Sequence, residues 1–187
     1  MNIRTNIKTV GVIGTGTMGA GIAQTFAQAG RTVLMHDSIP GAVERALGTI
    51  KKSLDKLVEK QKLAADVAQA ARAGLRPAGL SDMAGVDLIV EAVFEDVGVK
   101  RDLYTELAKS VAPEVIFASN TSSISISQLG AVSGRPEQFI GMHFFNPVPM
   151  MKLVEVVVGL RTAEPVVAAI SALAKELGKT PLRVKDH

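Results

Sequence analysis

The sequence predicts a doubly wound α/β fold, in which a mostly parallel sheet carries helices on both faces. Segments typical of strands and of helices alternate along the chain, and this order is what a parallel sheet requires. Of the 187 residues 47% are hydrophobic, whereas only 4% are aromatic and Trp is absent. That bias favours buried parallel strands over an aromatic-rich β-sandwich. The length suits one domain with a small appendage.

The N-terminal part of the chain predicts a βαβ unit. The run KTVGVI at 8–13 is typical of a buried strand, GAGIAQTFAQAG at 19–30 of a helix that ends at Gly30, and RTVLMHD at 31–37 of a second strand. The crossover of such a unit is almost always right-handed. Residues 39–73 have a helical period with a break at Gln61–Lys62. They predict two helices that project from the sheet.

The alternation continues to the end of the chain. The expected strands are VDLIVEAV at 86–93, EVIFASN at 114–120, QFIGMHF at 138–144, KLVEVVV at 152–158 and TPLRVKDH at 180–187. The expected helices are 97–111, a short one that begins within TSSISISQL at 121–129, and 165–177.

Composition argues against several classes of function. The chain has no cysteine, and its three histidines, His36, His143 and His187, lack a metal-ligand spacing, so we expect no metal site. The net charge of +3 is small and no basic segment carries interleaved aromatics, which favours a small polyanionic ligand over nucleic acid. No signal peptide or membrane span is recognisable, so we expect no membrane association and a cytoplasmic location.

A glycine-rich turn follows the first expected strand. Gly14, Gly16 and Gly19, with Met18 between the last two, match G-x-G-x-x-G and open the first helix. In this context Gly14 permits a tight turn, Gly16 lets the backbone approach a diphosphate, and Gly19 allows close helix–strand packing. The helix N-terminus offers unpaired N–H groups to the diphosphate. The pattern predicts a dinucleotide site of the Rossmann type.

Asp37 ends the second expected strand, 23 residues after Gly14. A carboxylate there accepts hydrogen bonds from ribose hydroxyls and repels a 2′-phosphate, which favours NAD over NADP. The alternative is that Asp37 only caps the following helix. FAD shares the glycine fingerprint, but the rest of the chain shows no flavin domain. We therefore expect NAD as cofactor.

His143 and Glu155 lie in the two strands on either side of an Asn146–Pro147 turn. Hydride transfer from an alcohol needs a group that takes the hydroxyl proton, and histidine suits this role. A carboxylate on the other ring nitrogen fixes the tautomer, and a buried Glu155 would need such a partner. Alternatively, His143 caps a strand edge and Glu155 faces water. The expected position of His143 and Asn120 at the carboxyl ends of strands favours the catalytic interpretation.

Four segments together carry a resemblance to a known family. GVIGTGTMGAGIAQ, VEAVFEDVGVK, NTSSISI and GMHFFNPVPMMKLVEVV occur in this order. They resemble the L-3-hydroxyacyl-CoA dehydrogenase family, and most of all its bacterial 3-hydroxybutyryl-CoA dehydrogenase branch. The resemblance covers essentially the whole chain, and HFFNP is much more specific than the glycine loop.

The resemblance implies a role for each matching position. It implies His143 as catalytic base and Glu155 as its orienting partner, and Ser122 resembles the serine that binds the substrate oxygen. The implied cofactor and pocket contacts are Asn120, Asn146, Glu95 and Lys100. Apart from the resemblance, Ser122 is only a helix-capping candidate, and Glu95 and Lys100 form an ordinary solvated pair.

A basic helix face is the candidate site for coenzyme A. Ser53, Lys56 and Lys60 recur on one face, and Lys52 extends the lysine ladder. The resemblance implies that Ser53 and Lys60 hold the coenzyme. The alternative is a solvated face, because Asp55 and Glu59 intervene.

The resemblance implies an NAD-dependent oxidoreductase of class EC 1.1.1.- that interconverts (S)-3-hydroxyacyl-CoA and 3-ketoacyl-CoA, with a short chain such as 3-hydroxybutyryl-CoA. Residues 1–187 would be its NAD-binding domain, with the helical hairpin at about 39–73. We expect a helical substrate and dimerisation domain to follow residue 187, a homodimer in the full-length protein, and little or no activity in these residues alone. The alternatives are a gulonate-type hydroxy-acid dehydrogenase and an NAD-binding module without turnover.

Overall fold

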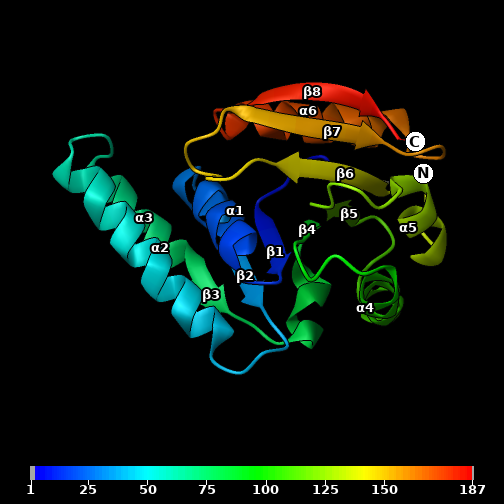
Figure 1. Cartoon of the computed structure of the whole chain (residues 1–187), viewed down its shortest axis with the longest axis horizontal. Coiled ribbons are helices and arrows are strands. Elements are labelled where there is room, and N and C mark those ends of the chain that lie inside the picture. Colours follow the sequence, from blue (N-terminus) through cyan, green and yellow to red (C-terminus); the bar gives the residue numbers. More distant parts are fainter. Residues whose placement is uncertain (1–2, 187) are drawn as a thin grey trace.

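Eight strands form one sheet in the computed structural model, which describes residues 3–186. In chain order they are β1 (Thr9–Ile13), β2 (Thr32–His36), β3 (Leu75–Pro77), β4 (Leu88–Glu91), β5 (Ile116–Ser119), β6 (Phe139–Phe144), β7 (Leu153–Val158) and β8 (Thr180–Lys185). Across the sheet the order is β3-β2-β1-β4-β5-β6-β7-β8 (Figure 1). Every neighbouring pair is parallel except β6 and β7, which are antiparallel. The prediction of a doubly wound, mostly parallel sheet is confirmed.

Helices cover both faces of this sheet. They are α1 (Thr17–Gln28), α2 (Ala42–Glu59), α3 (Ala65–Gly74), α4 (Val97–Ser110), α5 (Ile126–Val132) and α6 (Glu164–Glu176), with a 3-10 helix, η1 (Leu80–Gly85). The chain crosses from β1 to β2 on one side and reaches β4 on the other side of β1. In such sheets the crevice at the carboxyl ends of the two central strands is the usual ligand site.

Two apolar cores result from the alternation of side chains along the strands. Val10 and Val12 of β1 face the larger core, which α1, α3 and α6 cover. Ile89 of β4 and Phe117 of β5 face the second core, beneath α4 and α5. The near-continuous apolar runs in the sequence reflect strands that are buried on both faces.

The α2–α3 pair forms the hairpin that the sequence predicts, and it projects from the sheet (Figure 1). One narrow stripe on α2 is buried, made by Ala42, Ala46, Ile50 and Leu54 at every fourth position. The expected break also occurs, since Gln61 adopts a left-handed backbone with φ of 54° between the two helices. Val43, Leu47 and Val58 beside this stripe also pack against the larger core, and the polar residues of α2 lie mainly on its exposed side.

Two elements were not expected from the sequence, the edge strand β3 and η1. β3 has three residues and ends in Pro77, and proline is tolerated there because an edge strand leaves one row of N–H groups unpaired. The expected last strand is confirmed as β8, but His187 lies outside the described residues, as do residues 1 and 2 of the expected domain. Within residues 3–186 no helix is both long and apolar enough to cross a membrane.

Asp87 ties the amino ends of the central strands together. Its Oδ2 accepts hydrogen bonds from the backbone N–H groups of Lys8 and Thr9, each at 2.9 Å. Its Oδ1 accepts one from Arg4 Nη1 at 3.0 Å. Burial raises the pKa of Asp87, but these hydrogen bonds and the Arg4 charge outweigh it and hold the pKa below the ordinary value.

We expect Asp87→Asn to destabilise the fold most at neutral pH. A depressed folded-state pKa means that the carboxylate stabilises the fold above its ordinary pKa of 3.8, and that this contribution is lost as pH falls below that value. Urea unfolding at pH 7 should show a loss of about 1.5–3 kcal/mol. The loss should shrink on titration toward pH 3. An equal loss at both pH values would contradict this explanation.

Candidate active site

His143 and Glu155 face each other across the antiparallel pair of strands. They are register partners in β6 and β7, so their side chains leave the same face of the sheet. His143 Nδ1 lies 2.8 Å from Glu155 Oε2. Since a carboxylate only accepts hydrogen bonds, Nδ1 carries the proton and Nε2 keeps its lone pair for another partner.

The dyad is half-buried. The His143 side chain is 19% exposed and that of Glu155 29%. The expectation that Glu155 is buried is therefore wrong. Val154 and Val156 of β7 face the larger core, so Glu155 between them leaves the other face of the sheet, where it is half-buried. The expected pairing itself is confirmed, as is the position of His143 near the carboxyl end of β6.

The glycine loop between β1 and α1 has the geometry that the sequence predicts. Gly14 has φ of +87°, and an added Cβ would lie 2.5 Å from Ala92 O. A Cβ at Gly19 would overlap Gly14 O at 1.7 Å, so helix α1 can pack on the loop only with glycine there. At Gly16, by contrast, no atom lies within 4 Å of an added Cβ. The open position is the one that the motif reserves for a diphosphate.

Asp37 follows β2 and holds this loop. Its Oδ2 accepts from Thr15 N at 2.7 Å and Thr15 Oγ1 at 2.9 Å, while Oδ1 accepts from Ile39 N at 3.0 Å. Burial raises the pKa of Asp37, but these hydrogen bonds outweigh it and lower the pKa below its ordinary value. The alternative that Asp37 caps the following helix is wrong, because α2 begins at Ala42 with Gly41 as its N-cap.

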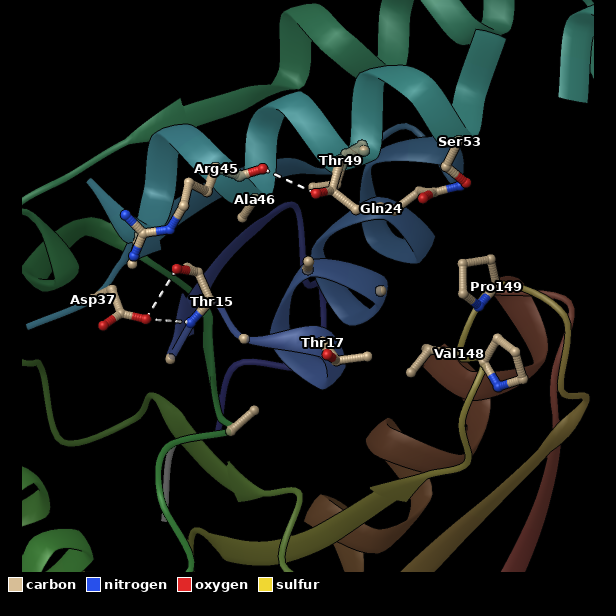
Figure 2. Close-up of a pocket in the computed structure, with 18 of the residues that line it drawn as sticks. Thr15, Thr17, Gln24, Asp37, Arg45, Ala46, Thr49, Ser53, Val148 and Pro149 are labelled. Atoms are coloured by element: carbon tan, nitrogen blue, oxygen red, sulfur yellow. Dashed lines mark hydrogen bonds between the residues drawn. The ribbon is translucent and has the colours of Figure 1, made fainter. Parts of the chain in front are cut away.

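A cavity of about 1260 Å³ opens beside the loop. Its walls are the glycine loop, Asp37, the inner face of α2 and the segment after β6, as Figure 2 shows. Among the predicted site residues it brings together Gly14, Gly16, Asp37, Asn146, Ser53 and Lys60. Two others of the glycine motif lie elsewhere, since Met18 packs against the larger core and Gly19 is buried under the loop.

The basic face of α2 forms one wall of this cavity. Ser53, Lys56 and Lys60 line it, whereas Lys52 does not. Asp55 does not neutralise these lysines, because its carboxylate binds Lys51 at 3.2 Å and also Arg72. Within residues 3–186 no ion pair joins Lys56 or Lys60 to an acid, Glu59 included, so the predicted face presents their positive charge to the cavity.

A second polar group surrounds the ends of β4 and β5. Asn120 Oδ1 accepts a hydrogen bond from Phe144 N at 2.8 Å, next to His143. Ser122 is exposed, and its N–H donates to Glu95 Oε1 at 3.2 Å. Lys100 is only 1% exposed, so the alternative of a solvated Glu95–Lys100 pair is wrong. Among the described residues no hydrogen bond joins Ser122 to His143.

Comparison with known proteins agrees with this geometry. The family model described as the NAD-binding domain of 3-hydroxyacyl-CoA dehydrogenase matches residues 9–187. The chain belongs to this family. It is similar to a probable 3-hydroxybutyryl-CoA dehydrogenase of Deinococcus radiodurans, with 49% identity over 94% of the chain and 63% of that protein. The 3-hydroxybutyryl-CoA dehydrogenase of Clostridioides difficile is 41% identical, again over 94% and 63%.

The fold comparison leads to the same family. A crystal structure of (S)-3-hydroxybutyryl-CoA dehydrogenase from Ralstonia eutropha superimposes with a TM-score of 0.94 and 44% identity, over 97% of this chain and 65% of that one. The chain spans 63% of the length of each of the two curated relatives named above. Its resemblance to the family, inferred from sequence segments, is confirmed.

NAD is the cofactor of this family domain, and the residues present fit it. The open backbone at Gly16 leaves room for a diphosphate. Of the roughly four lone-pair directions of the Asp37 carboxylate, three are used by Thr15 and Ile39. One remains on Oδ1 for a ribose hydroxyl.

Two anchoring residues of this NAD-binding domain were missed. Lys179 is 8% exposed and donates to Val148 O at 2.6 Å and to Met151 O at 2.8 Å, which holds the cavity wall after β6; burial lowers its pKa. Asp186 accepts from Ser125 Oγ and from the N–H groups of Ile126 and Ser127 at the start of α5. The sequence signals were weak, because a lone Lys after Gly178 and an Asp after a strand are common.

We expect Gly16→Ala to fold normally and to lose affinity for NADH. The added Cβ meets no protein atom within 4 Å, but it occupies the space where the diphosphate approaches the backbone. Calorimetry should show at least about tenfold weaker binding, the equivalent of roughly 1.4 kcal/mol. The matched control is Gly48→Ala on α2, also open and not part of the cavity wall. Equal NADH affinity in both variants would contradict the role of Gly16.

Proposed function

We propose that this chain carries the NAD-binding and catalytic part of an enzyme that interconverts (S)-3-hydroxyacyl-CoA and 3-ketoacyl-CoA. The preferred substrate in this proposal is short, such as 3-hydroxybutyryl-CoA. The observation that carries the proposal is the hydrogen bond of 2.8 Å between His143 Nδ1 and Glu155 Oε2, in a domain that binds NAD. The names of the curated relatives support the substrate class.

His143 is the proton acceptor in the oxidative direction. Its Nε2 takes the proton from the C3 hydroxyl as the C–H bond at C3 breaks. Bound NAD supplies the nicotinamide that accepts the hydride. Glu155 holds the Nδ1–H tautomer before the transfer and stabilises the imidazolium after it. In the reductive direction the imidazolium returns the proton to the oxygen of the 3-keto group.

Polar groups around the dyad position the substrate and the cofactor in this proposal. The Ser122 hydroxyl donates a hydrogen bond to the substrate oxygen, and Asn120 and Asn146 line the space between substrate and nicotinamide. Glu95 contacts the ribose next to the nicotinamide in this proposal, and Lys100, which is 1% exposed and pairs with Glu95, supplies its charge to the same side. The direct support is that Asn146 lines the cavity and that Asn120 binds the backbone beside His143.

The lysine face of α2 holds coenzyme A in this proposal. Ser53 donates a hydrogen bond, and Lys60 neutralises phosphate as a point charge. A gulonate-type hydroxy acid, the other candidate substrate, has no phosphate that would need this face. A homodimer, a further domain beyond residue 187 and a cytoplasmic location all stay predictions.

We expect His143→Gln to lower kcat by about 10²- to 10⁴-fold, the usual contribution of a general base. Glu155→Gln should lower kcat by about 10- to 100-fold, because the charged hydrogen bond of the imidazolium is lost. The assay follows NADH oxidation with acetoacetyl-CoA in the protein that the full reading frame encodes. NADH affinity should change less than about twofold.

The control for these variants is Glu164→Gln, a surface acid that pairs with Arg183. It should keep full activity, because exposed ion pairs contribute little. A His143→Gln protein with a kcat near that of the parent would rule out the proposed base.

We expect Lys60→Glu to raise the KM for acetoacetyl-CoA about three- to tenfold, while the KM for NADH stays the same. The reversed charge repels the coenzyme phosphates instead of attracting them. Lys52→Glu is the matched control, because Lys52 lies on the same helix but does not line the cavity. Indistinguishable KM values for the two variants would argue against CoA at this face and favour a hydroxy-acid substrate.

A further inference from the structure

A group of buried polar side chains lies at the carboxyl ends of β4 and β5, beside the cavity but not in its wall. Glu91, Tyr104 and Ser119 are fully buried, and Lys100 is 1% exposed. Only Lys100 has a part in the proposed reaction. The other three need a separate explanation, since burial of charged and polar groups is costly unless each is paired.

The Glu91 carboxylate is fully hydrogen-bonded. Its Oε1 accepts from Lys100 Nζ at 2.5 Å and from Val93 N at 2.9 Å. Its Oε2 accepts from Ser119 Oγ at 2.7 Å and from the Tyr104 hydroxyl at 3.1 Å. Burial, together with the Glu91 charge, raises the pKa of Tyr104 well above its ordinary value, so the phenol stays a donor.

Stability alone does not account for this arrangement. Replacement of a buried ion pair by apolar residues of similar volume is often neutral or stabilising. What the pair does provide is a fixed position for the Lys100 ammonium, which is held from one side by an immobile carboxylate. Lys100 also pairs with a second carboxylate, that of Glu95.

The Lys100 ammonium pairs with Glu95, and Glu95 in turn accepts hydrogen bonds from the loop that follows β5. Lys100 Nζ lies 3.2 Å from Glu95 Oε2, and the Glu95 side chain is 39% exposed. Glu95 Oε1 in turn accepts from Ser122 N at 3.2 Å, from Ser123 Oγ at 3.1 Å and from Thr121 Oγ1. A half-exposed carboxylate holds a loop weakly unless something fixes it. Lys100 fixes it here.

We propose that Glu91 is a positioning residue, which fixes Lys100 and through it Glu95, and so places Ser122 for the substrate oxygen. This inference rests on the function proposed above. Glu91 does not line the cavity. Its backbone O accepts from Asn120 N at 2.8 Å, and its partner Ser119 Oγ also accepts from Thr121 N at 3.3 Å. Among the hydrogen bonds of the described residues, none joins the Glu91 carboxylate directly to Thr121, Ser122 or Ser123. A substitution of the Glu91 side chain leaves the backbone contact to Asn120 in place. It therefore separates the positioning effect from the cofactor contacts proposed for Glu95 and Lys100.

A double-mutant cycle between Glu91→Gln and Ser122→Ala tests the proposal. Glutamine puts an NH₂ group where the carboxylate accepts hydrogen bonds, so the contact to Lys100 or those to Ser119 and Tyr104 must change. In the full-length protein, kcat with acetoacetyl-CoA and NADH should fall about tenfold in each single variant. The kcat of the double variant should be no lower than that of Ser122→Ala alone. If Glu91 acts through the position of the Ser122 hydroxyl, its substitution has no further effect once that hydroxyl is removed. The KM for NADH should stay within about twofold.

Asp87→Asn is the matched control, because Asp87 stands at the opposite end of β4 and ties down the fold without contact to the loop. It should lower stability and leave kcat unchanged. If Glu91→Gln does not fold, Tyr104→Phe replaces it in the cycle. That variant keeps the ring against Phe117 and Phe139 and removes one hydrogen bond to Glu91, so a smaller, equally coupled loss of kcat is expected.

The amide signal of Ser122 in a ¹H–¹⁵N spectrum reports the loop position without any reaction. It should shift in Glu91→Gln and not in Asp87→Asn. Additive losses of kcat, or an unmoved Ser122 amide, in a folded variant would overturn the proposal. A parent protein that oxidises no NADH while its Ser122 amide still responds to Glu91→Gln would refute the proposed function and leave the positioning role standing.

Discussion

The hydrogen bond between His143 and Glu155 is the contact on which the proposed chemistry depends. It exists because β7 returns antiparallel to β6, which puts the two residues in register on one face. Had β7 joined the sheet in parallel, as the other strands do, the carboxylate would face a different neighbour. The single antiparallel pair of the described sheet thus produces the dyad, and the parallel strands beside it supply the NAD-binding crevice.

Carboxylates hold loops at both ends of the strands, since Asp186 follows β8 on the side where β6 begins. Asp37 binds the glycine loop at Thr15, Glu95 binds the loop that carries Ser122, and Asp186 binds the first N–H groups of α5. In each case burial raises the pKa, but hydrogen bonds, together with the Lys100 charge at Glu95, outweigh it and lower the pKa. Such loops would otherwise be mobile, so the site is built from segments that are individually tied to the scaffold. In the core, the fully hydrogen-bonded Glu91 carboxylate holds Lys100, and Lys100 pairs with Glu95.

The sequence predicted features whose causes are local. The glycine loop follows from contacts within or beside the turn, and the dyad from two consecutive strands joined by the loop at 145–152. The hairpin follows from helical period and a break near Gln61. The anchors Glu91, Lys179 and Asp186 were missed, because each binds a partner far along the chain, Ser119 at 28, Val148 at 31 and Ser127 at 59 residues. Only the folded sheet brings them together. The edge strand β3 was missed because three residues carry no period.

The tautomer of His143 is the most direct test of the central claim. ¹⁵N shifts of the imidazole nitrogens distinguish the two neutral forms, and a spectrum of His143→Gln identifies the signals among the three histidines of the chain. The account predicts a proton on Nδ1, which is donated to Glu155, and a bare Nε2 that responds when Glu155 is changed to Gln. A neutral ring protonated on Nε2, or signals unaffected by Glu155→Gln, would contradict it.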